Sequence, residues 1–409
     1  MINNRFLTRL SSLIFSRGSR SLKGMALVSL LLGGWFCEAR GCTSGLFGAS
    51  VTRDGRMLLW KHRDTSAIDN KVAFIPSSGG SLAFVGLFNA ADRDCREVWG
   101  GFNEAGLAVM NTASYNIKDD DVAESKMDRE GFVMRQALEH CRTVDDFALL
   151  LDSLPRPMGV EANFGVFDAS GNGAYFETNN HSYRRYDLKD EEGDWIVRTN
   201  YSHGGRPNEG YGFVREANAL YLLEPAVATA SVSPELLTEG VSRSFYHSSF
   251  GRDFLNSGET WAIDQDFIPR YKSSAVIVIE GNVIGEGAED GSDYVMWTGL
   301  GYPPCSEIYP VTCSASGVDP GLQGTGPQGH SPLSDRARKR RDEVFPIHYG
   351  NGDKYIRLDR LSNAEGTGYI QTLVPQNLEA YRRYRETHGR KTHERIGKER
   401  CIEEGDEKR

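Results

Sequence analysis

The sequence predicts an α+β protein in which sheets and helices pack in layers. Short β-prone segments occupy the first part of the chain, two helical segments follow between residues 130 and 154, and strands and helices then alternate. The helical segments repeat apolar residues at helical spacing, whereas the strands are short and separated by turn residues. The 45 glycines fit the many turns between such strands. This order of elements is typical of layered α+β packing.

The size and charge of the chain limit the number of its domains and the class of its main partner. With 409 residues it is long enough for one large domain or two medium ones. Its formal net charge of -9 argues against nucleic acid as the main partner. The sequence does not predict an oligomeric state.

The N-terminus has the pattern of an export signal. Met1–Lys23 contains five basic residues and no acidic one, and the apolar run Met25–Phe36 follows. Ala39 and Gly41 place small side chains three and one residues before Cys42, as a cleavage after Gly41 requires. The sequence therefore predicts a cleaved signal peptide and export to the periplasm or the extracellular space.

Two other interpretations of the N-terminus remain open. The leader could stay attached as an anchor, or Cys42 could be acylated as in a lipoprotein. The lipoprotein is less favoured, because Arg40 fits poorly in the small, uncharged run that such processing prefers. The apolar run is shorter than the ~20 residues that a membrane span needs, and no other segment is long and apolar enough, so no stable span is expected after cleavage.

The first predicted element after the signal is a β-hairpin. Gly45–Val51 is β-prone, Asp54-Gly55 is a hairpin turn signal, and Met57–Lys61 forms the returning strand. This pairing would bring Asp64 near Cys42 and hold the new N-terminus in place. Further strands are predicted at residues 71–75, 81–87, 97–102 and 107–111.

The predicted elements then change to helices. Glu130–Cys141 has apolar residues at helical spacing, and Thr143 caps a second helix, which has an acidic first turn and ends at Pro155. Beyond it, strands are predicted at 163–168, 173–177, 183–188, 195–199, 274–280 and 294–298, and helices at 211–223 and from Ser233.

Composition divides the chain into five parts. Residues 1–41 are the signal peptide and 42–313 the main domain. Residues 314–343 are predicted as a loop, first rich in Gly, Ser and Pro and then charged and solvated. Residues 344–377 extend the domain, and 378–409 form a charged tail, helical or disordered, with little apolar face.

Cys42 is the candidate nucleophile. After cleavage it carries a thiol and a free α-amine on one residue, which together supply a nucleophile and a base. The reference pKa of an α-amine, about 7.7–8.0, suits proton transfer near neutral pH. Four other cysteines leave two alternatives open: disulfides, with Cys305–Cys313 and Cys95–Cys141 as candidate pairs, or free thiols.

Four polar residues downstream complete the candidate site. Asp64 ends the strand that pairs with the Cys42 strand, where it can orient the α-amine. Asn111 and Asn200 each end a predicted strand, and two amide donors aimed at one point form an oxyanion hole. Arg215 opens a predicted helix and places a cation that can bind a substrate carboxylate or support the site. The ordinary alternatives are strand-end and turn formers for the Asp and Asn side chains, and a solvated surface residue for the Arg.

Together these residues resemble the cysteine N-terminal-nucleophile hydrolases, which include choloylglycine hydrolase, penicillin V acylase and the isopenicillin-N acyltransferase type. Cys42-Thr43 matches the Cys-Thr opening of the family, and the Asp-Gly turn followed by residues 58–64 looks like its second strand, which ends in Arg-x-x-Asp. Residues 103–111 and Thr199-Asn200 resemble the two segments that carry its oxyanion-region asparagines. The resemblance covers residues 42–310.

The resemblance implies a fold and further site residues. The fold of the family is an αββα sandwich, with two antiparallel sheets between helix layers. Arg215 is the best match for the late Arg of the family. Lys61 stands where choloylglycine hydrolases carry Arg, a departure that loses bidentate carboxylate binding. Lys61 and Tyr201 are assigned to substrate binding. Apart from the resemblance, an apolar acyl pocket has five aromatic candidates, for which core packing is the alternative: Phe84, Phe88, Trp99, Tyr115 and Tyr201.

The resemblance implies hydrolysis of the linear, non-peptide amide C–N bond of a small-molecule N-acyl amide through a thioester on Cys42. An amine in place of water would make the same site an acyltransferase. The alternatives are an N-terminal-cysteine dipeptidase and a secreted or lipid-anchored binding protein, while the sequence signature of a papain-like protease is absent. Neither a metal-ligand cluster nor a phosphate-binding loop is visible in the sequence, so no metal and no cofactor is expected.

Overall fold

The computed structural model describes residues 41–119, 121–284, 290–348, 350 and 354–388. All of them belong to one unit that starts at Arg40. The predicted signal peptide lies outside the described residues except for Gly41, and so does the end of the predicted tail from residue 389. The described residues therefore comprise the main domain and the C-terminal segments up to residue 388.

Within these residues, thirteen strands form two antiparallel sheets, with the strand orders β10-β1-β2-β14-β15-β16 and β3-β4-β5-β6-β7-β8-β9. The six-stranded sheet contains β1 (Thr43–Phe47), β2 (Arg56–Asp64), β10 (Trp195–Arg198), β14 (Ser273–Val283), β15 (Val295–Leu300) and β16 (Tyr309–Val311). The seven-stranded sheet contains β3 (Asn70–Ile75), β4 (Phe84–Asn89), β5 (Gly100–Asn103), β6 (Ala108–Ala113), β7 (Ala162–Phe167), β8 (Gly173–Thr178) and β9 (Tyr183–Asp187).

The predicted hairpin forms between β1 and β2. Thr43 pairs with His62 and Phe47 with Leu58. Gly55 in the turn has a φ of 65°, a left-handed conformation that glycine adopts without strain. Because β1 lies between β10 and β2, the strand that begins next to Cys42 has hydrogen-bonded partners on both edges.

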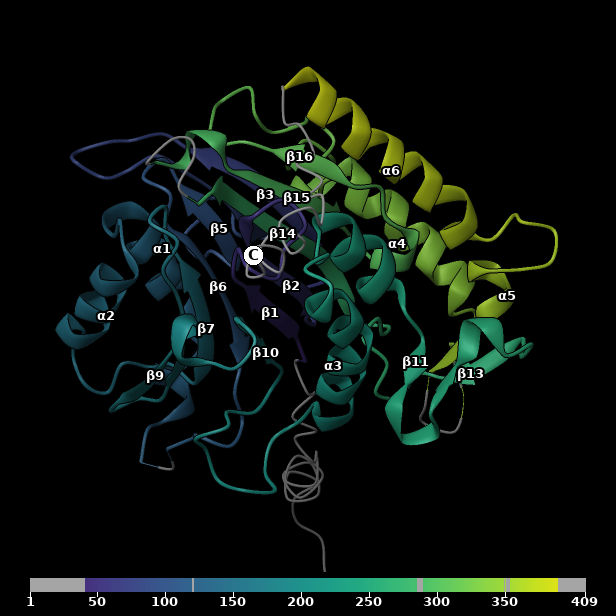
Figure 1. The fold of residues 1–409 in the computed structure, drawn as a ribbon, viewed down its shortest axis with the longest axis horizontal. Coiled ribbons are helices and arrows are strands. Elements are labelled where there is room, and N and C mark those ends of the chain that lie inside the picture. Colours follow the sequence, from purple (N-terminus) through teal and green to yellow (C-terminus); the bar gives the residue numbers. More distant parts are fainter. Residues whose placement is uncertain (1–40, 120, 285–289, 349, 351–353, 389–409) are drawn as a thin grey trace, which may run out of the picture. The chain divides into compact units, whose positions relative to one another are not determined.

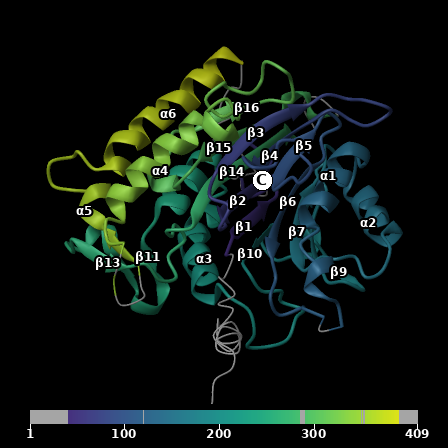
Figure 2. The same cartoon turned by 180° about the vertical axis from the view of Figure 1, so that it is seen from behind.

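The two sheets pack face to face, and helices cover the outer face of each. Side chains from both sheets form one buried cluster between them. A second cluster packs α1 (Glu130–His140) and α2 (Val144–Ser153) on the seven-stranded sheet. A third packs α3 (Phe213–Ala228) and α6 (Tyr369–Thr387) on the six-stranded sheet. Figures 1 and 2 show these layers from opposite sides. The predicted αββα sandwich is confirmed.

Strand β2 contributes to two of these layers. Met57 and Leu59 belong to the cluster between the sheets, whereas Leu58 and Trp60 belong to the cluster under the helices. The reason is that successive side chains of a strand point to opposite faces. By the same alternation Lys61 lies on the side of Leu59, so a lysine enters the space between the two sheets.

The predicted helix cap is confirmed at α2. Thr143 Oγ1 accepts a hydrogen bond from the Asp146 main-chain N–H at 3.0 Å, and an Asp146 carboxylate oxygen accepts from the Thr143 N–H at 3.0 Å. This reciprocal capping box satisfies two amide groups at the helix end. The apolar face of α2 then packs Phe147 against Phe164 and Phe176 of the sheet.

The prediction of a loop over residues 314–343 is wrong at its end. Helix α4 (Pro332–Val344) forms there, with Ser331 Oγ accepting from the Ser334 N–H at 3.2 Å and Pro332 in the first helical position. The charged run was expected to be solvated, but it has one buried face, formed by Leu333, Ser334, Ala337, Arg341 and Val344. Spacings of three and four residues place these side chains on one side of the helix.

The predicted boundary at residue 378 falls inside helix α6, which begins at Tyr369. The Tyr381 ring is buried, and its centroid lies 3.9 Å from that of Trp297 on β15. Its hydroxyl shares a hydrogen bond of 2.9 Å with Thr238 Oγ1. The expectation of little apolar face is therefore wrong for the part of the tail that belongs to α6.

Short elements complete the described part. Two small antiparallel pairs are β11 (Tyr246–His247) with β12 (Arg252–Asp253), and β13 (Trp261–Ile263) with β17 (Tyr355–Arg357). Helix α5 spans Leu358–Leu361. Single turns lie at Glu124–Lys126, Leu188–Asp190, Leu236–Gly240, Val241–Arg243, Ser248–Phe250, Phe254–Asn256, Gly291–Asp293, Pro303–Cys305 and Pro327–Gly329.

Two further expectations can be compared with the described residues. Cys95, Cys141, Cys305 and Cys313 are free thiols there, so the disulfide alternative is not the one that the structure shows. None of the described helices combines the length and the apolar composition needed to cross a membrane.

Candidate active site

Cys42 follows Gly41 and lies directly before β1. It is buried, and its Sγ lies 3.7 Å from the main-chain oxygen of Asp64 at the end of β2. The pairing of Ser44 with Arg198 between β1 and β10, continued past the strand ends, sets Cys42 opposite Asn200. The hairpin therefore holds the candidate nucleophile between Asp64 and Asn200, two other predicted site residues.

Arg215, in the first turn of α3, joins three of these positions. Its Nη1 donates to the Cys42 carbonyl oxygen at 2.6 Å and to Thr43 Oγ1 at 3.1 Å, and its Nη2 donates to Asn200 Oδ1 at 2.8 Å. Burial and the nearby Arg270 lower the pKa of Arg215 to about 9, which leaves it charged at neutral pH. The guanidinium is thus a fixed support of the Cys42 backbone.

Gly212 makes room for this guanidinium. It precedes α3 with a φ of 95°, and a Cβ at this position would lie 2.5 Å from Arg215 Nη2. Both the left-handed backbone and the close approach require a residue without a side chain. The turn into α3 is therefore shaped so that Arg215 reaches the Cys42 strand.

Asp64 is near Cys42 as predicted, but its carboxylate binds another group. It accepts hydrogen bonds from Arg270, at 3.1 Å from Nε and also from Nη2, and from Ser273 Oγ at 2.6 Å. Arg270 Nη2 also donates to the Gly41 carbonyl oxygen at 3.0 Å. Asp64 thus acts on the backbone before Cys42 through Arg270, a residue that sequence reasoning missed.

No sequence signal pointed to Arg270. It lies just before β14, and the pairing of Ser273 with Asp64 places that strand beside the end of β2. This neighbourhood joins residues about two hundred positions apart. Only the pairing of the strands reveals it.

Lys61 and Asn111 meet across the two sheets. Lys61 Nζ donates to Asn111 Oδ1 at 2.8 Å and to the main-chain oxygen of Trp99 at 2.7 Å. Burial lowers the pKa of Lys61 to about 7, against the attraction of a Cys42 thiolate, which favours the charged form. The lysine predicted to bind substrate is therefore buried at the base of the site, where it orients the amide of Asn111.

Asn111 and Asn200 come from different sheets. Asn111 was expected to end a strand but lies inside β6, paired with Phe164. Asn200 follows the end of β10, where its Nδ2 donates to the Ala113 carbonyl oxygen at 2.9 Å. With Oδ1 held by Arg215, the Asn200 amide is fixed at both ends and keeps one N–H for another acceptor. The predicted site residues therefore converge on the start of β1.

One model of a known protein family matches part of the chain. The model of the acyl-coenzyme A:6-aminopenicillanic acid acyl-transferase family matches residues 64–218. The matched segment begins at Asp64 and contains Asn111, Asn200 and Arg215. This match supports the resemblance to the N-terminal-nucleophile hydrolases.

Solved structures similar to this chain share little sequence with it. The Caenorhabditis elegans ortholog of N-acylethanolamine-hydrolyzing acid amidase is 14% identical with a TM-score of 0.34, covering 47% of this chain and 87% of that chain. Conjugated bile acid hydrolase from Clostridium perfringens is 12% identical with a TM-score of 0.39, covering 66% and 92%. Penicillin V acylase from Agrobacterium tumefaciens is 12% identical with a TM-score of 0.37, covering 66% and 86%. No curated protein matches the chain.

Aromatic side chains lie around Asn200. The Tyr201 ring packs against Phe213 with centroids 4.3 Å apart, and the Tyr115 ring meets Tyr211 edge-on at 5.2 Å. Tyr211 and Phe213 are exposed, and Tyr201 is half-buried. Tyr201, predicted to bind substrate, therefore belongs to an apolar surface next to the site.

Two groups of side chains in the described residues could offer ligands to a metal ion, although no metal-ligand cluster is visible in the sequence. In each group three ligand atoms lie within 4.8 Å of one another; the groups are Asp69, His330 and Asp335, and Asp119, Asp121 and His181. In the first group Arg338 forms ion pairs with both carboxylates, which offsets their charge. Neither group includes a predicted site residue.

Proposed function

We propose that this protein is an exported N-terminal-nucleophile amidase that cleaves the linear C–N bond of small N-acyl amides through a thioester on Cys42. The superfamily supports amide hydrolysis or acyl transfer as the class of reaction. The observation that carries the finer proposal is the place of Cys42, at the start of the central hairpin, with Arg215 on its carbonyl and Asn200 opposite. The export signal supports location outside the cytoplasm.

The proposed reaction begins after removal of residues 1–41. The free α-amine of Cys42 takes the thiol proton, and the thiolate attacks the carbonyl carbon of the amide. Asn111 and Asn200 stabilise the negative charge on the carbonyl oxygen. The amine then gives its proton to the leaving nitrogen, and a thioester remains on Sγ. Water attacks the thioester and releases the carboxylic acid.

Acyl transfer is the second candidate function. The matching family is named for an acyltransferase, and the same thioester would transfer its acyl group if an amine displaced water. The aromatic surface at Tyr201 and Phe213 supports an apolar acyl group in either reaction. Adding an amine nucleophile to the assay and measuring the ratio of amide to acid in the products separates the two.

The deciding experiment determines both the N-terminal residue of the exported protein and its amidase activity. The intact mass of the exported protein should correspond to an unmodified chain starting at Cys42. Cys42→Ser should abolish turnover of N-acyl amides, since a hydroxyl is a far poorer nucleophile near the pKa of the α-amine. Cys313→Ser, a half-buried cysteine outside the site, serves as the matched control and should keep its rate.

Three outcomes contradict the proposal. These are a mature chain that starts at another residue, a diacylglyceryl adduct on Cys42, and an undiminished rate in Cys42→Ser. Preferred cleavage of dipeptides in the same panel of substrates would favour the dipeptidase alternative.

A further inference from the structure

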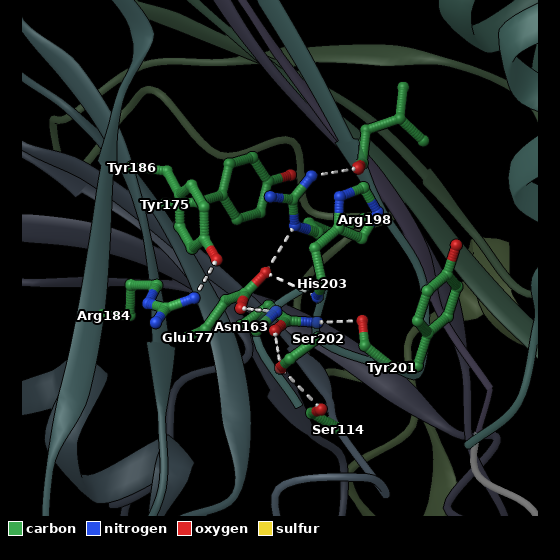
Figure 3. Close-up of polar contacts among 12 residues, drawn as sticks. Ser114, Asn163, Tyr175, Glu177, Arg184, Tyr186, Arg198, Tyr201, Ser202 and His203 are labelled. Atoms are coloured by element: carbon green, nitrogen blue, oxygen red, sulfur yellow. Dashed lines mark hydrogen bonds and ion pairs between the residues drawn. The ribbon is translucent and has the colours of Figure 1, made fainter. Parts of the chain in front are cut away.

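Asn163 on β7 is a buried polar residue to which the proposed reaction assigns no role. Its side chain has no exposed surface. It belongs to the seven-stranded sheet, where it pairs with Thr112, the neighbour of Asn111. Figure 3 shows its amide pointing at the segment after β10, between the main chain of Tyr201 and the Ser202 hydroxyl.

The Asn163 amide holds the main chain on both sides of Asn200. Its Nδ2 donates to the Thr199 carbonyl oxygen at 3.3 Å and to the Tyr201 carbonyl oxygen at 3.0 Å. The same nitrogen lies 3.2 Å from Thr112 Oγ1. One side chain thus connects the residues before and after one candidate oxyanion donor with the residue next to the other.

The hydroxyl of Ser202 completes this contact. Ser202 Oγ donates to Asn163 Oδ1 at 2.5 Å and lies 2.7 Å from Ser114 Oγ, and the Ser202 N–H donates to Asn116 Oδ1 at 2.7 Å. All of these partners come from β7 or from the chain that leaves β6. The Asn200 segment is therefore fixed from the opposite sheet.

Glu177 on β8 anchors the far end of the same segment. Its carboxylate accepts hydrogen bonds from the N–H groups of His203 and Gly204, both at 2.8 Å, and from Arg198 Nε at 2.9 Å (Figure 3). Residues 198–204 are thus held at both ends, and Asn163 contacts the part that contains Asn200.

We propose that Asn163 is a positioning residue for the oxyanion hole, which keeps Asn200 at a fixed distance from Asn111 and from Cys42. This inference rests on the proposed function. An amide suits the role because it offers two N–H groups to two carbonyl oxygens and one oxygen to a hydroxyl. Asp has the same shape but presents only acceptors when ionised, so Asn163→Asp removes the contacts to the Thr199 and Tyr201 carbonyl oxygens with little change in volume, whereas the Ser202 hydroxyl can still donate to it.

The test is a double-mutant cycle with Asn200, using kcat per titrated active site. Asn200→Ala should lower kcat by ~10²–10³-fold, as loss of an oxyanion donor does. Asn163→Asp should lower kcat by ~10²-fold, as expected for a misplacement of about 1 Å, with a smaller change in KM. If Asn163 acts through Asn200, adding Asn163→Asp to Asn200→Ala should change kcat by less than about two-fold.

Asn103 on β5 supplies the matched control. It is equally buried in the same sheet, and its Nδ2 donates to the carbonyl oxygens of Leu138 and Cys141 at 3.0 and 2.8 Å. Asn103→Asp should lower the melting temperature without changing kcat per titrated site. If Asn163→Asp fails to fold, Ser202→Ala removes the hydroxyl that donates to Asn163 and should show the same lack of additivity with Asn200→Ala.

The outcomes separate this inference from the proposed function. Wild-type protein that forms no thioester with any N-acyl amide defeats the proposed function. If wild type is active, a normal kcat in Asn163→Asp, or a loss that multiplies with that of Asn200→Ala, overturns the positioning role. A crystal structure of Asn163→Asp is a readout independent of activity: a displaced Asn200 side chain supports the inference, and an unmoved one opposes it.

Discussion

At the scale of single residues, Lys61 shows how a buried charge connects the nucleophile to the opposite sheet. It extends from β2 into the space between the sheets and donates to Asn111 Oδ1 and to the Trp99 carbonyl oxygen. An ammonium group in that place is costly to bury. The two acceptors and a Cys42 thiolate offset part of this cost, and the rest lowers the pKa of Lys61 to about 7.

The lowered pKa of Lys61 predicts a stability difference that depends on pH. The ordinary pKa is 10.5 and the folded value is about 7, so between these values the unfolded chain binds one proton more than the folded chain. The contribution of Lys61 to the unfolding free energy of the wild type therefore rises as pH increases from about 7 to 10.5. Met carries no proton, so any advantage of Lys61→Met over wild type should be greatest below pH 7 and shrink toward pH 10.

Urea unfolding of wild type and Lys61→Met at pH 6, 8 and 10 measures this difference. Other titrating groups are common to both proteins and cancel in the comparison. The loss of two hydrogen bonds in the variant adds a constant that does not change with pH. A difference in unfolding free energy that is the same at the three pH values would show that Lys61 does not titrate in this window.

At the scale of secondary-structure elements, α4 is the clearest case in which composition predicted a solvated loop and the chain forms a packed helix. The segment reads as charged, and its ion pairs with Asp69 and Glu307 lie partly exposed. Ala337 nevertheless packs without exposure against Gly301, where a Cβ would lie 2.6 Å from that of Ala337. The helix is therefore docked by a few small and apolar side chains, whereas exposed ion pairs contribute little.

This docking predicts unequal effects of the same substitution on the two faces of α4. Ala337→Glu forces a larger, charged side chain into a closed space and should lower the unfolding free energy by about 2 kcal/mol or more. Lys339→Glu, on the exposed face, should change it by less than about 0.5 kcal/mol. Thermal melting of both variants beside wild type is the measurement. Equal melting temperatures would mean that α4 is not packed as described.

At the scale of the whole molecule, polar contacts cross between the sheets close to the site. Ser44 on β1 and Tyr175 on β8 share a hydrogen bond of 2.9 Å, and burial raises the pKa of the Tyr175 hydroxyl. Lys61 with Asn111 and Asn163 with Tyr201 are further bonds of this kind. The site therefore depends on the exact alignment of two sheets that contribute different residues.

The contact between Ser44 and Tyr175 predicts a measurable contribution to stability. Tyr175→Phe should cost about 1 kcal/mol, because Ser44 Oγ keeps its other hydrogen bond, to the Arg198 carbonyl oxygen. Tyr302→Phe is the matched control, since among the described residues its buried hydroxyl has no hydrogen-bond partner, and its loss should be neutral or stabilising. Chemical unfolding that ranks the two variants in the opposite order would contradict the role given to Tyr175.

The sequence alone predicted the opening hairpin, the helices α1 and α2 and the candidate nucleophile, but not helix α4. The Asp54-Gly55 turn, the Thr143 cap and the helical spacing in Glu130–Cys141 are local signals, and the structure agrees with them. Such features are predictable because their physical causes, turn conformation, capping and periodic burial, act between residues a few positions apart. The set of Cys42, Asp64, Asn111, Asn200 and Arg215 came from their order along the chain and from the family that they resemble.

The tertiary structure decided what these residues contact. Asp64 lies against Arg270, Lys61 against Asn111, and Asn163 against the segment of Asn200. Each contact joins strands or turns that are distant in sequence, so it depends on strand register and on how one sheet lies on the other. A shift of register by one residue would turn each of these side chains to the other face of its sheet. Local pattern carries no information about that alignment, which long-range packing of the core determines.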